Sequence, residues 1–236
     1  MRLDRYLAEM GMGSRSELKK KIRQGDAVVD GRRICDPGYP VAADSAVIFC
    51  GSPVVYEAFV YYMLNKPAGV ISATEDRRQE TVLDLLKGPV RKDIFPVGRL
   101  DRDTEGLLLL TNDGELAHRL LSPGKHVDKK YFARVRGTIT EETIRKFREG
   151  MYVDDSLTAL PAELKVLQAE VGGITDTEVI IREGKFHQIK RMFLAAGAEV
   201  LYLKRLQMGP LILDPALEPG SYRQLTDTEI RNLKEM

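Results

Sequence analysis

The sequence predicts an α+β fold divided into a small first domain, residues 1–55, and a larger second domain, residues 59–236. Two observations lead to this prediction. Helix-type and strand-type segments follow each other without the strict alternation that builds a parallel sheet, so the larger domain should hold a mixed, largely antiparallel sheet. The chain also changes character at Gly51-Ser52-Pro53, where a series of short elements ends and longer apolar segments begin.

Composition excludes several classes of protein. The chain has 43% hydrophobic and 30% charged residues, which is ordinary for a globular protein. Its two cysteines, Cys35 and Cys50, form no CxxC pair, which argues against a disulfide framework or a zinc ribbon. Because there is no run of about 20 apolar residues and no signal-peptide pattern, we expect a cytoplasmic protein without a membrane segment. The net charge of +1 by itself indicates no anionic partner.

Two helices are expected at the start of the first domain. Residues 2–10 carry apolar side chains at helical spacing, namely Leu3, Tyr6, Leu7 and Met10. After a glycine break, Ser14-Arg15-Ser16-Glu17 matches a capping box, in which the serine hydroxyl and the glutamate carboxylate bind each other's backbone amides. The second helix should run to about Gln24 and end at Gly25.

Short strands should follow these helices. Residues 27–29 form an apolar strand-type segment, and Asp30-Gly31 is a dipeptide typical of a two-residue hairpin turn. The chain is then expected to return through residues 32–34, and residues 47–49 supply another short strand. The first domain is therefore predicted to be a compact unit of helix, helix and hairpin.

Basic side chains are concentrated on the second predicted helix. Five lie between residues 15 and 23 and are opposed only by Glu17: Arg15, Lys19, Lys20, Lys21 and Arg23. One interpretation is a solvated helix face, which is common for such a cluster. Beside a capped helix start, however, Arg and Lys charges together with free backbone N–H groups can hold phosphates. Binding of that kind weakens steeply with added salt.

Three segments of the first domain, Met1–Leu7, Ser14–Glu17 and Gly25–Gly31, together resemble the S4 RNA-binding module. This module occurs in ribosomal protein S4 and in many RNA-modifying enzymes. The resemblance implies that residues 1–55 are an S4-like RNA-binding domain. Its residues expected to contact RNA are Arg2, Arg5, Ser14, Arg15, Lys19, Lys20 and Arg23.

The second domain mixes strand-type and helix-type segments in irregular order. Strands are expected at residues 61–65, 107–110, 131–136, 161–166, 176–182 and 200–205. Helices are expected at residues 81–86, 114–122 and 186–196, and also from residues 140 and 226 onward. The four consecutive leucines Leu107–Leu110 should form a buried strand.

The loop from Gly98 to Gly106 is the densest polar segment of the second domain. It carries two arginines and three carboxylates between an apolar lead-in and the predicted buried strand. Buried charges must be paired, so a salt-bridged surface turn is one interpretation. A second takes Asp101-x-Asp103 as the nucleophile pair of a magnesium-dependent phosphotransferase. That class needs a more apolar lead-in, and Glu105 stands where it usually has Thr or Val.

A third interpretation rests on four motifs that occur in order. Gly98-Arg99-Leu100-Asp101-x-x-Thr104-x-Gly106, continued through Leu107–Gly114, resembles the signature of ribosomal pseudouridine synthases of the small-subunit synthase A type. Met63–Gly69 resembles the first motif of that family, Lys129-Lys130-Tyr131 its Lys-x-Tyr segment, and Glu183–Phe193 its third motif. With the S4-like start, the motifs cover nearly the whole chain, which is thus identified as a member of this family.

The resemblance implies roles for three catalytic residues. Asp101 takes the position of the essential aspartate of the family, and Tyr131 that of its base-stacking tyrosine. Lys190 takes the position of the basic residue beside the aspartate, where many relatives outside this branch have arginine. A neighbouring cation favours the ionised form of an aspartate. We therefore expect Asp101 and Lys190 to form an ion pair in a cleft.

The remaining expectations concern the surroundings of this cleft. Leu203 should form a wall of the uracil pocket, as an apolar residue does in relatives. Arg99 should contact a phosphate or fill the place of an extruded base, and an ion pair with a neighbouring acid is the alternative. Asp103 and Glu105 are expected to structure the loop.

The reaction of this family converts uridine to pseudouridine by exchanging an N1–C1′ bond for a C5–C1′ bond. It involves no redox change and adds no outside atom, so we expect neither a metal nor an organic cofactor. The histidines His118, His126 and His187 lack ligand spacing with acids or cysteines, and structural roles are expected for them.

We therefore predict a cofactor-free, monomeric enzyme that modifies 16S rRNA in the small ribosomal subunit or in an assembly intermediate of it. The segment from Leu121-Ser122-Pro123 to Tyr131 favours the small-subunit branch of the family. Two alternatives stay open. One is a large-subunit (23S) rRNA pseudouridine synthase of the same superfamily, and the other is a non-catalytic rRNA-binding assembly factor.

Overall fold

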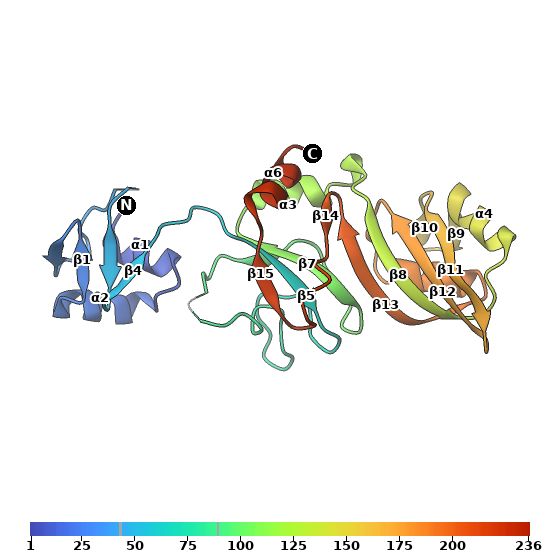
Figure 1. Ribbon diagram of the computed structural model, residues 1–236, viewed down its shortest axis with the longest axis horizontal. Coiled ribbons are helices and arrows are strands. Elements are labelled where there is room, and N and C mark those ends of the chain that lie inside the picture. The colour runs from blue at the N-terminus through green and yellow to red at the C-terminus, as the bar shows by residue number, and fades with distance from the viewer. Residues whose placement is uncertain (43, 89) are drawn as a thin grey trace. The chain divides into compact units, whose positions relative to one another are not determined.

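The computed structural model describes residues 1–42, 44–88 and 90–236, and the chain divides into two compact units (Figure 1). The first unit comprises Met1–Val60 and Leu86–Ile94, and the second comprises Tyr61–Leu85 and Phe95–Met236. The boundary expected between residues 55 and 59 stays a prediction. None of the helices in the described part of the chain is long and apolar enough to cross a membrane.

The first unit packs two helices on a small antiparallel sheet. The helices are α1 (Leu3–Glu9) and α2 (Arg15–Gln24). The strands are β1 (Ala27–Val29), β2 (Arg32–Ile34), β3 (Val47–Phe49) and β4 (Ser52–Val54), in the order β2-β1-β3-β4. The apolar faces of both helices and the inward residues of the strands form one core, which includes Leu3, Leu7, Leu18, Ile22 and Phe49.

The capping signals at α2 are confirmed. The Ser14 hydroxyl accepts a hydrogen bond from the Glu17 amide at 3.3 Å, and the Glu17 carboxylate accepts one from the Ser14 amide at 2.9 Å. Gly25 ends the helix with φ +84°, a left-handed conformation that glycine adopts without strain. The Asp30-Gly31 turn likewise has two positive φ angles, as a two-residue hairpin turn requires.

Strand β4 occupies the segment that sequence analysis interpreted only as a boundary. Phe49 pairs with Ser52 across a tight turn, and Pro53 lies opposite Ile48. Proline cannot donate a hydrogen bond to a neighbouring strand, but β4 is at the edge of the sheet, where the missing donor can be tolerated.

Residues 86–94 return to the first unit, although sequence analysis assigned them to the larger domain. Arg91 is buried, pairs with Asp93 at 2.8 Å and donates a hydrogen bond to the Glu57 carbonyl. A Cβ atom on Gly11 would lie 2.6 Å from the Val90 carbonyl carbon. This close backbone approach explains why glycine stands at that position.

The second unit is built on a mixed sheet whose main path is β11-β12-β8-β13-β7-β5-β15, with β14 added beside β13 and β6 beside β7. The strands are β5 (Tyr61–Lys66), β6 (Phe95–Pro96), β7 (Glu105–Thr111), β8 (Lys129–Arg136), β11 (Glu163–Val171), β12 (Ile174–Ile181), β13 (Glu199–Met208), β14 (Leu211–Ile212) and β15 (Tyr222–Gln224). Strands β13 and β7 pair in parallel, and the other paired strands are antiparallel. The predicted α+β class with a largely antiparallel sheet is confirmed.

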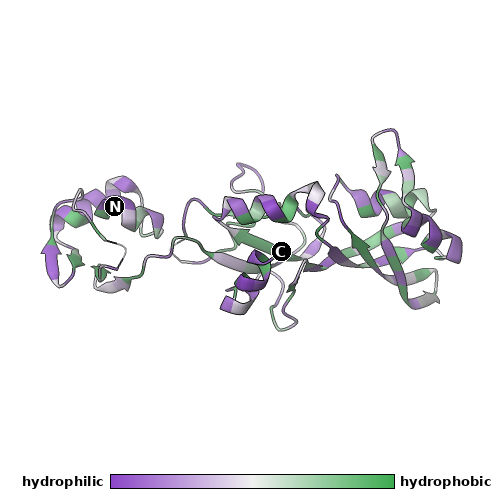
Figure 2. Ribbon diagram, turned by 90° about the horizontal axis from the view of Figure 1, so that it is seen from above, coloured by the Kyte–Doolittle hydropathy of each residue, from purple (hydrophilic) through white to green (hydrophobic). Residues whose placement is uncertain are grey.

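Helices and a small second sheet cover this framework. They are α3 (Gly114–Leu121), the 3-10 turn η1 (Pro123–Lys125), α4 (Glu141–Glu149), α5 (Gln188–Ala195), α6 (Asp227–Lys234), and the hairpin of β9 (Met151–Asp154) and β10 (Leu157–Ala159). Leu107–Leu110 of β7 are fully buried, as predicted. Leu107 and Leu109 share one apolar cluster with α3 and α6, and Figure 2 shows hydrophobic colour along these middle strands.

Helix α5 lies against β13 and the β9–β10 hairpin with an apolar face. Ile189, Met192 and Phe193 are buried, and the Phe193 ring lies 5.1 Å from the ring of Phe147 in α4. Because these residues fix the orientation of α5, the intervening Lys190 is left on the partly exposed side of the helix.

The helix predicted at residues 81–86 is wrong. Thr81 instead forms an isolated parallel bridge with Ile71, and its amide and hydroxyl both donate to the Asp84 carboxylate. Only turns follow, since a single turn of helix gains too few hydrogen bonds to offset its nucleation cost.

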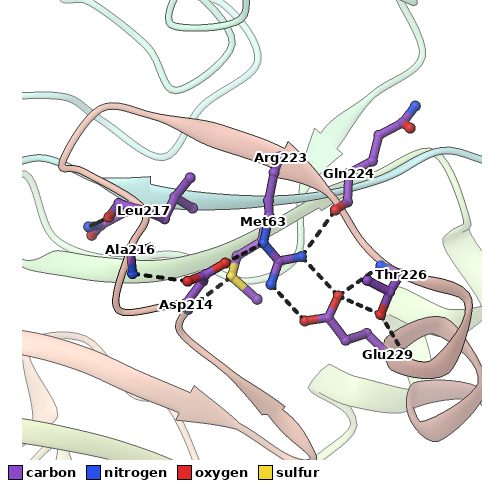
Figure 3. Close-up of polar contacts among 9 residues, drawn as sticks. Met63, Asp214, Ala216, Leu217, Arg223, Gln224, Thr226 and Glu229 are labelled. Carbon is purple, nitrogen blue, oxygen red and sulfur yellow. Dashed lines mark hydrogen bonds and ion pairs between the residues drawn. The ribbon is translucent and has the colours of Figure 1, made fainter.

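An ion network anchors the C-terminal segment to the sheet (Figure 3). Arg223 of β15 donates to Asp214 at 2.8 Å and to both carboxylate oxygens of Glu229 in α6 at 2.9 Å. Glu229 also closes a capping box with Thr226. The hydrogen bonds from Arg223 are the main cause that lowers the pKa of Glu229 to about 2.

Candidate active site

The loop that carries Asp101 joins β6 to β7 and is held by hydrogen bonds from Lys66 of β5. The Lys66 side chain is fully buried, and its ammonium donates to the carbonyls of Pro67 and Thr104 at 2.9 Å and of Arg102 at 3.3 Å. Burial lowers the pKa of Lys66 to about 8, although the carboxylates of the loop partly oppose that shift. Three backbone carbonyls therefore accept hydrogen bonds from one buried ammonium, and through these bonds Lys66 holds the loop in place.

A second set of contacts fixes the backbone immediately before Asp101. The Ser72 hydroxyl donates to the Leu100 carbonyl at 2.9 Å and accepts from the Leu100 amide at 3.0 Å. On the other side, the Thr104 amide donates to the Asp101 carbonyl at 3.1 Å. The Asp101 backbone is thus held on both sides, which keeps its side chain in a defined position.

Lys190 of α5 reaches both acids of the loop. Its ammonium lies 3.1 Å from the Asp101 carboxylate and 2.6 Å from that of Asp103. Burial disfavours the charged form of Lys190, but the hydrogen bonds and charges of the two aspartates outweigh it and raise its pKa. Burial likewise disfavours the charged form of Asp103, and Lys190 reverses this effect and lowers the pKa of Asp103. The expected proximity of Asp101 and Lys190 is present in the structure.

A small pocket, here called the inner pocket, brings the remaining predicted residues of the second unit together. Asp101, Lys190, Tyr131 and Leu203 all line it, around a cavity of about 60 Å³. Tyr131 of β8 and Leu203 of β13 come from adjacent strands and are largely buried. Thr104 also lines this pocket, and its hydroxyl is buried without a hydrogen-bond partner among the described residues.

A wider depression, here called the outer groove, shares part of its lining with the inner pocket, including Asp101. Its cavity volume is about 610 Å³. Its lining comes from three segments: Ile71, Ser72, Ala73 and Gln79; Arg99, Leu100, Asp101 and Arg102; and Gly184, Lys185, Phe186 and His187. The combination of a small pocket and an open groove suits a polymer that inserts one unit and leaves its neighbours outside.

Arg99 lies in this outer groove and is exposed. Within residues 1–42, 44–88 and 90–236, no hydrogen bond or ion pair of its side chain is found. The alternative of an ion pair with a neighbouring acid is therefore not what the structure contains. Asp103 pairs with Lys190 instead, and Glu105 accepts a hydrogen bond from the Tyr202 hydroxyl at 2.7 Å.

His187 is a site residue that sequence analysis missed. Its Nε2 atom lies 3.5 Å from the Asp101 carboxylate, and its ring stacks on that of Phe186. A structural role was expected for this histidine, because no metal-ligand spacing surrounds it in the sequence. The useful signal was the position of His187 inside the third motif, next to Gln188 and three residues before Lys190. The described residues contain no group of three or more His, Cys, Asp or Glu side chains placed to hold a metal ion.

The predicted RNA-contacting residues of the first unit differ in how free they are. Arg2 pairs with Asp4 at 2.9 Å, Arg5 pairs with Glu9 at 2.7 Å, and the Ser14 side chain is engaged in capping. Lys19 is half-buried. In contrast, α2 exposes three cations that make no ion pair or hydrogen bond among the described residues, namely Arg15, Lys20 and Arg23.

A cavity of about 500 Å³ in the first unit is lined by a further basic residue, Lys92, which was not among the predicted RNA-contacting residues. Arg5, Arg15 and Lys92 line it together with Glu9 and Asp93. Lys92 was not predicted, because it lies in the returning segment 86–94, far from α2 in the sequence.

Comparison with known proteins assigns the chain to a family. A family model described as RNA pseudouridylate synthase matches residues 60–195, and an S4 domain model matches residues 1–47. The chain belongs to the RNA pseudouridylate synthase family. The resemblance inferred from the sequence motifs is thereby confirmed, for both the S4-like start and the catalytic domain.

This family member resembles its relatives over its whole length. It is 49% identical over 237 residues to the uncharacterized RNA pseudouridine synthase YtzG of Bacillus subtilis, with 100% of this chain and 99% of that protein covered. It is 36% identical over 236 residues to the ribosomal small subunit pseudouridine synthase A of Escherichia coli, with 99% and 100% covered. A crystal structure of a pseudouridylate synthase matches it with a TM-score of 0.69 at 33% identity and covers 99% of both chains.

Proposed function

We propose that this RNA pseudouridylate synthase isomerises a uridine of 16S rRNA without a cofactor, and that Asp101 is its essential carboxylate. The observation that carries the proposal is the position of Asp101. Its carboxylate lies 3.1 Å from the Lys190 ammonium, where the inner pocket and the outer groove meet. A partly exposed, charge-paired carboxylate at this junction can act on a nucleotide that enters from RNA.

The target uridine must leave its stack to reach Asp101, which costs a few kcal/mol. Tyr131 and Leu203 supply an aromatic ring and an aliphatic wall, and stacking on an aromatic ring is worth roughly 1–3 kcal/mol per base. Asp101 then attacks the base or the sugar, or removes a proton from the sugar; the bond to the carboxylate breaks again, or the sugar proton is returned, before the product leaves. The N1–C1′ bond breaks, the C5–C1′ bond forms, the C5 proton leaves to solvent and N1 takes up a proton.

The choice of 16S rRNA rests on the relatives. The Escherichia coli protein named for the small ribosomal subunit aligns with the whole of this chain. The free cations Arg15, Lys20 and Arg23 on α2 give the first unit a surface that suits rRNA phosphates. We expect the protein to act as a monomer on the small subunit or on an assembly intermediate.

The proposal is tested with 16S rRNA transcribed with tritium at C5 of uridine, because isomerisation releases that tritium to water and binding does not. We expect Asp101→Asn to bind the transcript with wild-type affinity and to release no tritium above background. Asp103→Asn is the matched control, since the same change is made two residues away in a carboxylate that contacts the same lysine. It should lose far less activity. Full activity of Asp101→Asn would remove the assigned role.

The same assay separates the alternatives. Release from labelled 23S transcript but not from 16S transcript would identify a large-subunit enzyme. Binding without release from either transcript, or from ribosomal subunits, would identify an assembly factor. Mapping pseudouridine in ribosomes of a deletion strain then gives the position of the modified nucleotide.

A further inference from the structure

An exposed aromatic side chain stands at the outer groove. Phe186 is 72% exposed, although one face of its ring lies on the imidazole of His187, with ring centroids 3.7 Å apart and planes inclined by 19°. The opposite face of the phenyl ring is therefore open to solvent. A large apolar surface left open beside a groove is typical of a binding surface rather than of a core.

The backbone holds this pair of rings in place. The Lys185 amide donates to the Gln188 side chain at 3.0 Å, and the Gln188 amide donates to the Lys185 carbonyl at 3.1 Å. His187 has φ +50°, a left-handed conformation uncommon for residues other than glycine, and occupies the N-cap position of α5 without a capping hydrogen bond from its side chain. The Arg191 guanidinium donates to the Phe186 carbonyl at 3.2 Å. Phe186 is thus exposed on a fixed turn, not on a free loop end.

The surroundings of the two rings favour a nucleic acid. The imidazole of His187 lies between Phe186 and the proposed reaction centre. Its Nε2 atom is 3.5 Å from the Asp101 carboxylate, and its ring centroid is 3.7 Å from that of Phe186. The cations Arg99, Arg102 and Lys185 line the groove; Arg102 donates to the Gly69 carbonyl at 2.9 Å, and Lys185 lies 3.4 Å from Glu183. Among the described residues that line it, Asp101 is the one acid, and it is paired with Lys190. Cations beside an exposed aromatic ring form the combination that binds single-stranded RNA.

We infer that Phe186, supported by His187, is a stacking platform for the nucleobase next to the target uridine. The inference rests on the proposed function and extends it to a second nucleotide. When the uridine leaves its stack, its neighbour loses a partner, and the Phe186 ring replaces that partner. Stacking of this kind tolerates any base, because every base has a π-face.

The chain contains no tryptophan, which gives a direct test. F186W in the Asp101→Asn background carries a single indole at the platform, and unlabelled 16S transcript should quench its fluorescence saturably and by at least half. Y152W in the same background is the matched control, because Tyr152 is 66% exposed and lies outside the groove. Its fluorescence should change little. Equal fluorescence of F186W with and without saturating RNA would overturn the inference.

Kinetics give a second, independent measure on the otherwise wild-type enzyme. F186A should lower kcat/KM for tritium release roughly 10-fold, within the range expected for loss of one base–aromatic stack. F186W and F186Y should retain most activity, whereas F186L should not, because leucine keeps an apolar surface without the π-face. Wild-type kinetics for F186A would contradict the inference while leaving the proposed function intact. If the wild-type protein releases no tritium but rRNA still quenches F186W, then Phe186 stacks on a base of bound RNA and the proposed isomerase function is excluded.

Discussion

Lys190 shares one ammonium between two carboxylates, and the asymmetry of this arrangement determines what it can do. Asp103 is mostly exposed and lies closer to the lysine, whereas Asp101 is mostly covered and lies at the junction of pocket and groove. Burial disfavours the charged form of Lys190, but both acids act against it and raise the pKa of Lys190 above its ordinary value. The Lys190 ammonium therefore places a positive charge directly beside Asp101.

We predict that Lys190→Met lowers kcat of tritium release roughly 100-fold, as loss of one preorganised charge in an active site typically does. Lys190→Arg should retain most of the activity, because a guanidinium also carries a permanent charge and can reach both acids. Single-turnover tritium release with saturating enzyme measures the effect, and thermal melting checks that the variants fold. Wild-type kcat in Lys190→Met would exclude the proposed role of the ion pair.

The sequence predicted which residues line the site better than it predicted the contacts between them. Asp101, Lys190, Tyr131 and Leu203 were placed in one cleft by motif resemblance, and all four line the inner pocket, while their catalytic roles stay predictions. The stacking of Phe186 on His187 could not be predicted, because it depends on a single left-handed φ angle at the start of α5.

At the scale of elements, the end of the catalytic loop depends on one glycine. Gly106 pairs with Arg205 in the parallel contact between β7 and β13, and a Cβ atom there would lie 2.2 Å from the Arg205 carbonyl oxygen. Its φ of +100° is also unfavourable for any other residue. The two sheet strands can therefore meet only if this position has no side chain.

We predict that Gly106→Ala lowers the free energy of unfolding by about 3 kcal/mol, from overpacking and backbone strain together. Gly114→Ala is the matched control, since Gly114 is the first residue of α3 and has open space around its Cα. It should leave stability unchanged or raise it by up to about 1 kcal/mol. Urea unfolding followed by circular dichroism measures both, and equal stabilities would contradict the packing argument.

The Arg223–Glu229 pair predicts a dependence of stability on pH. The pKa of Glu229 is lowered from 4.5 to about 2 mainly by Arg223, so the stabilisation is present above pH 4.5 and is lost as the pH falls toward 2. Glu229→Gln should therefore be less stable than wild type at pH 7, by about 2 kcal/mol, and should approach it at pH 2. Thermal melting across this range is the measurement. Glu149→Gln, which changes an exposed carboxylate, should show a constant small difference.

Elements with local signals were predicted well, and those without them were not. The capping boxes of α2 and α6 and the hairpin turn after β1 are encoded within a few residues. The short strand β15 lacks such a signal, because its place is set by pairing with β5, which lies far away in the sequence. Strands β4 and β14 were missed for a different reason, because each has only two or three residues and pairs with the preceding strand across a tight turn. Strand β6 also has only two residues.

At the scale of the whole molecule, the confirmed α+β class follows from the order of segments, but the strand order does not. The parallel contact of β13 with β7 brings residues about 100 positions apart into register, and no local pattern encodes it. The four motifs therefore predicted a shared site through their resemblance to a family. The order of the strands that brings them together could not be predicted from the sequence.

The cations of α2 should control how RNA binding depends on salt. We predict that the triple variant Arg15→Gln/Lys20→Gln/Arg23→Gln reduces the slope of log affinity against log salt by about 2, because each lost phosphate contact removes roughly 0.7–0.9. A matched triple on α4, Arg145→Gln/Lys146→Gln/Arg148→Gln, should leave the slope unchanged. Filter binding of 16S transcript over a salt series measures it. Identical slopes for the two triples would remove the proposed role of α2.

Because residues 86–94 belong to the first unit, two separate stretches of the gene encode that unit. The chain passes from one unit to the other three times, after Val60, after Leu85 and after Ile94. A gene fusion that transferred only the first sixty codons would move Glu57 and Gly11 to the recipient without residues 86–94. The Glu57 carbonyl would then lack its hydrogen bond from Arg91, and Gly11 would lack its contact with the Val90 backbone. Exchange of this unit between proteins should therefore carry both coding segments or select new residues to cover the exposed surface.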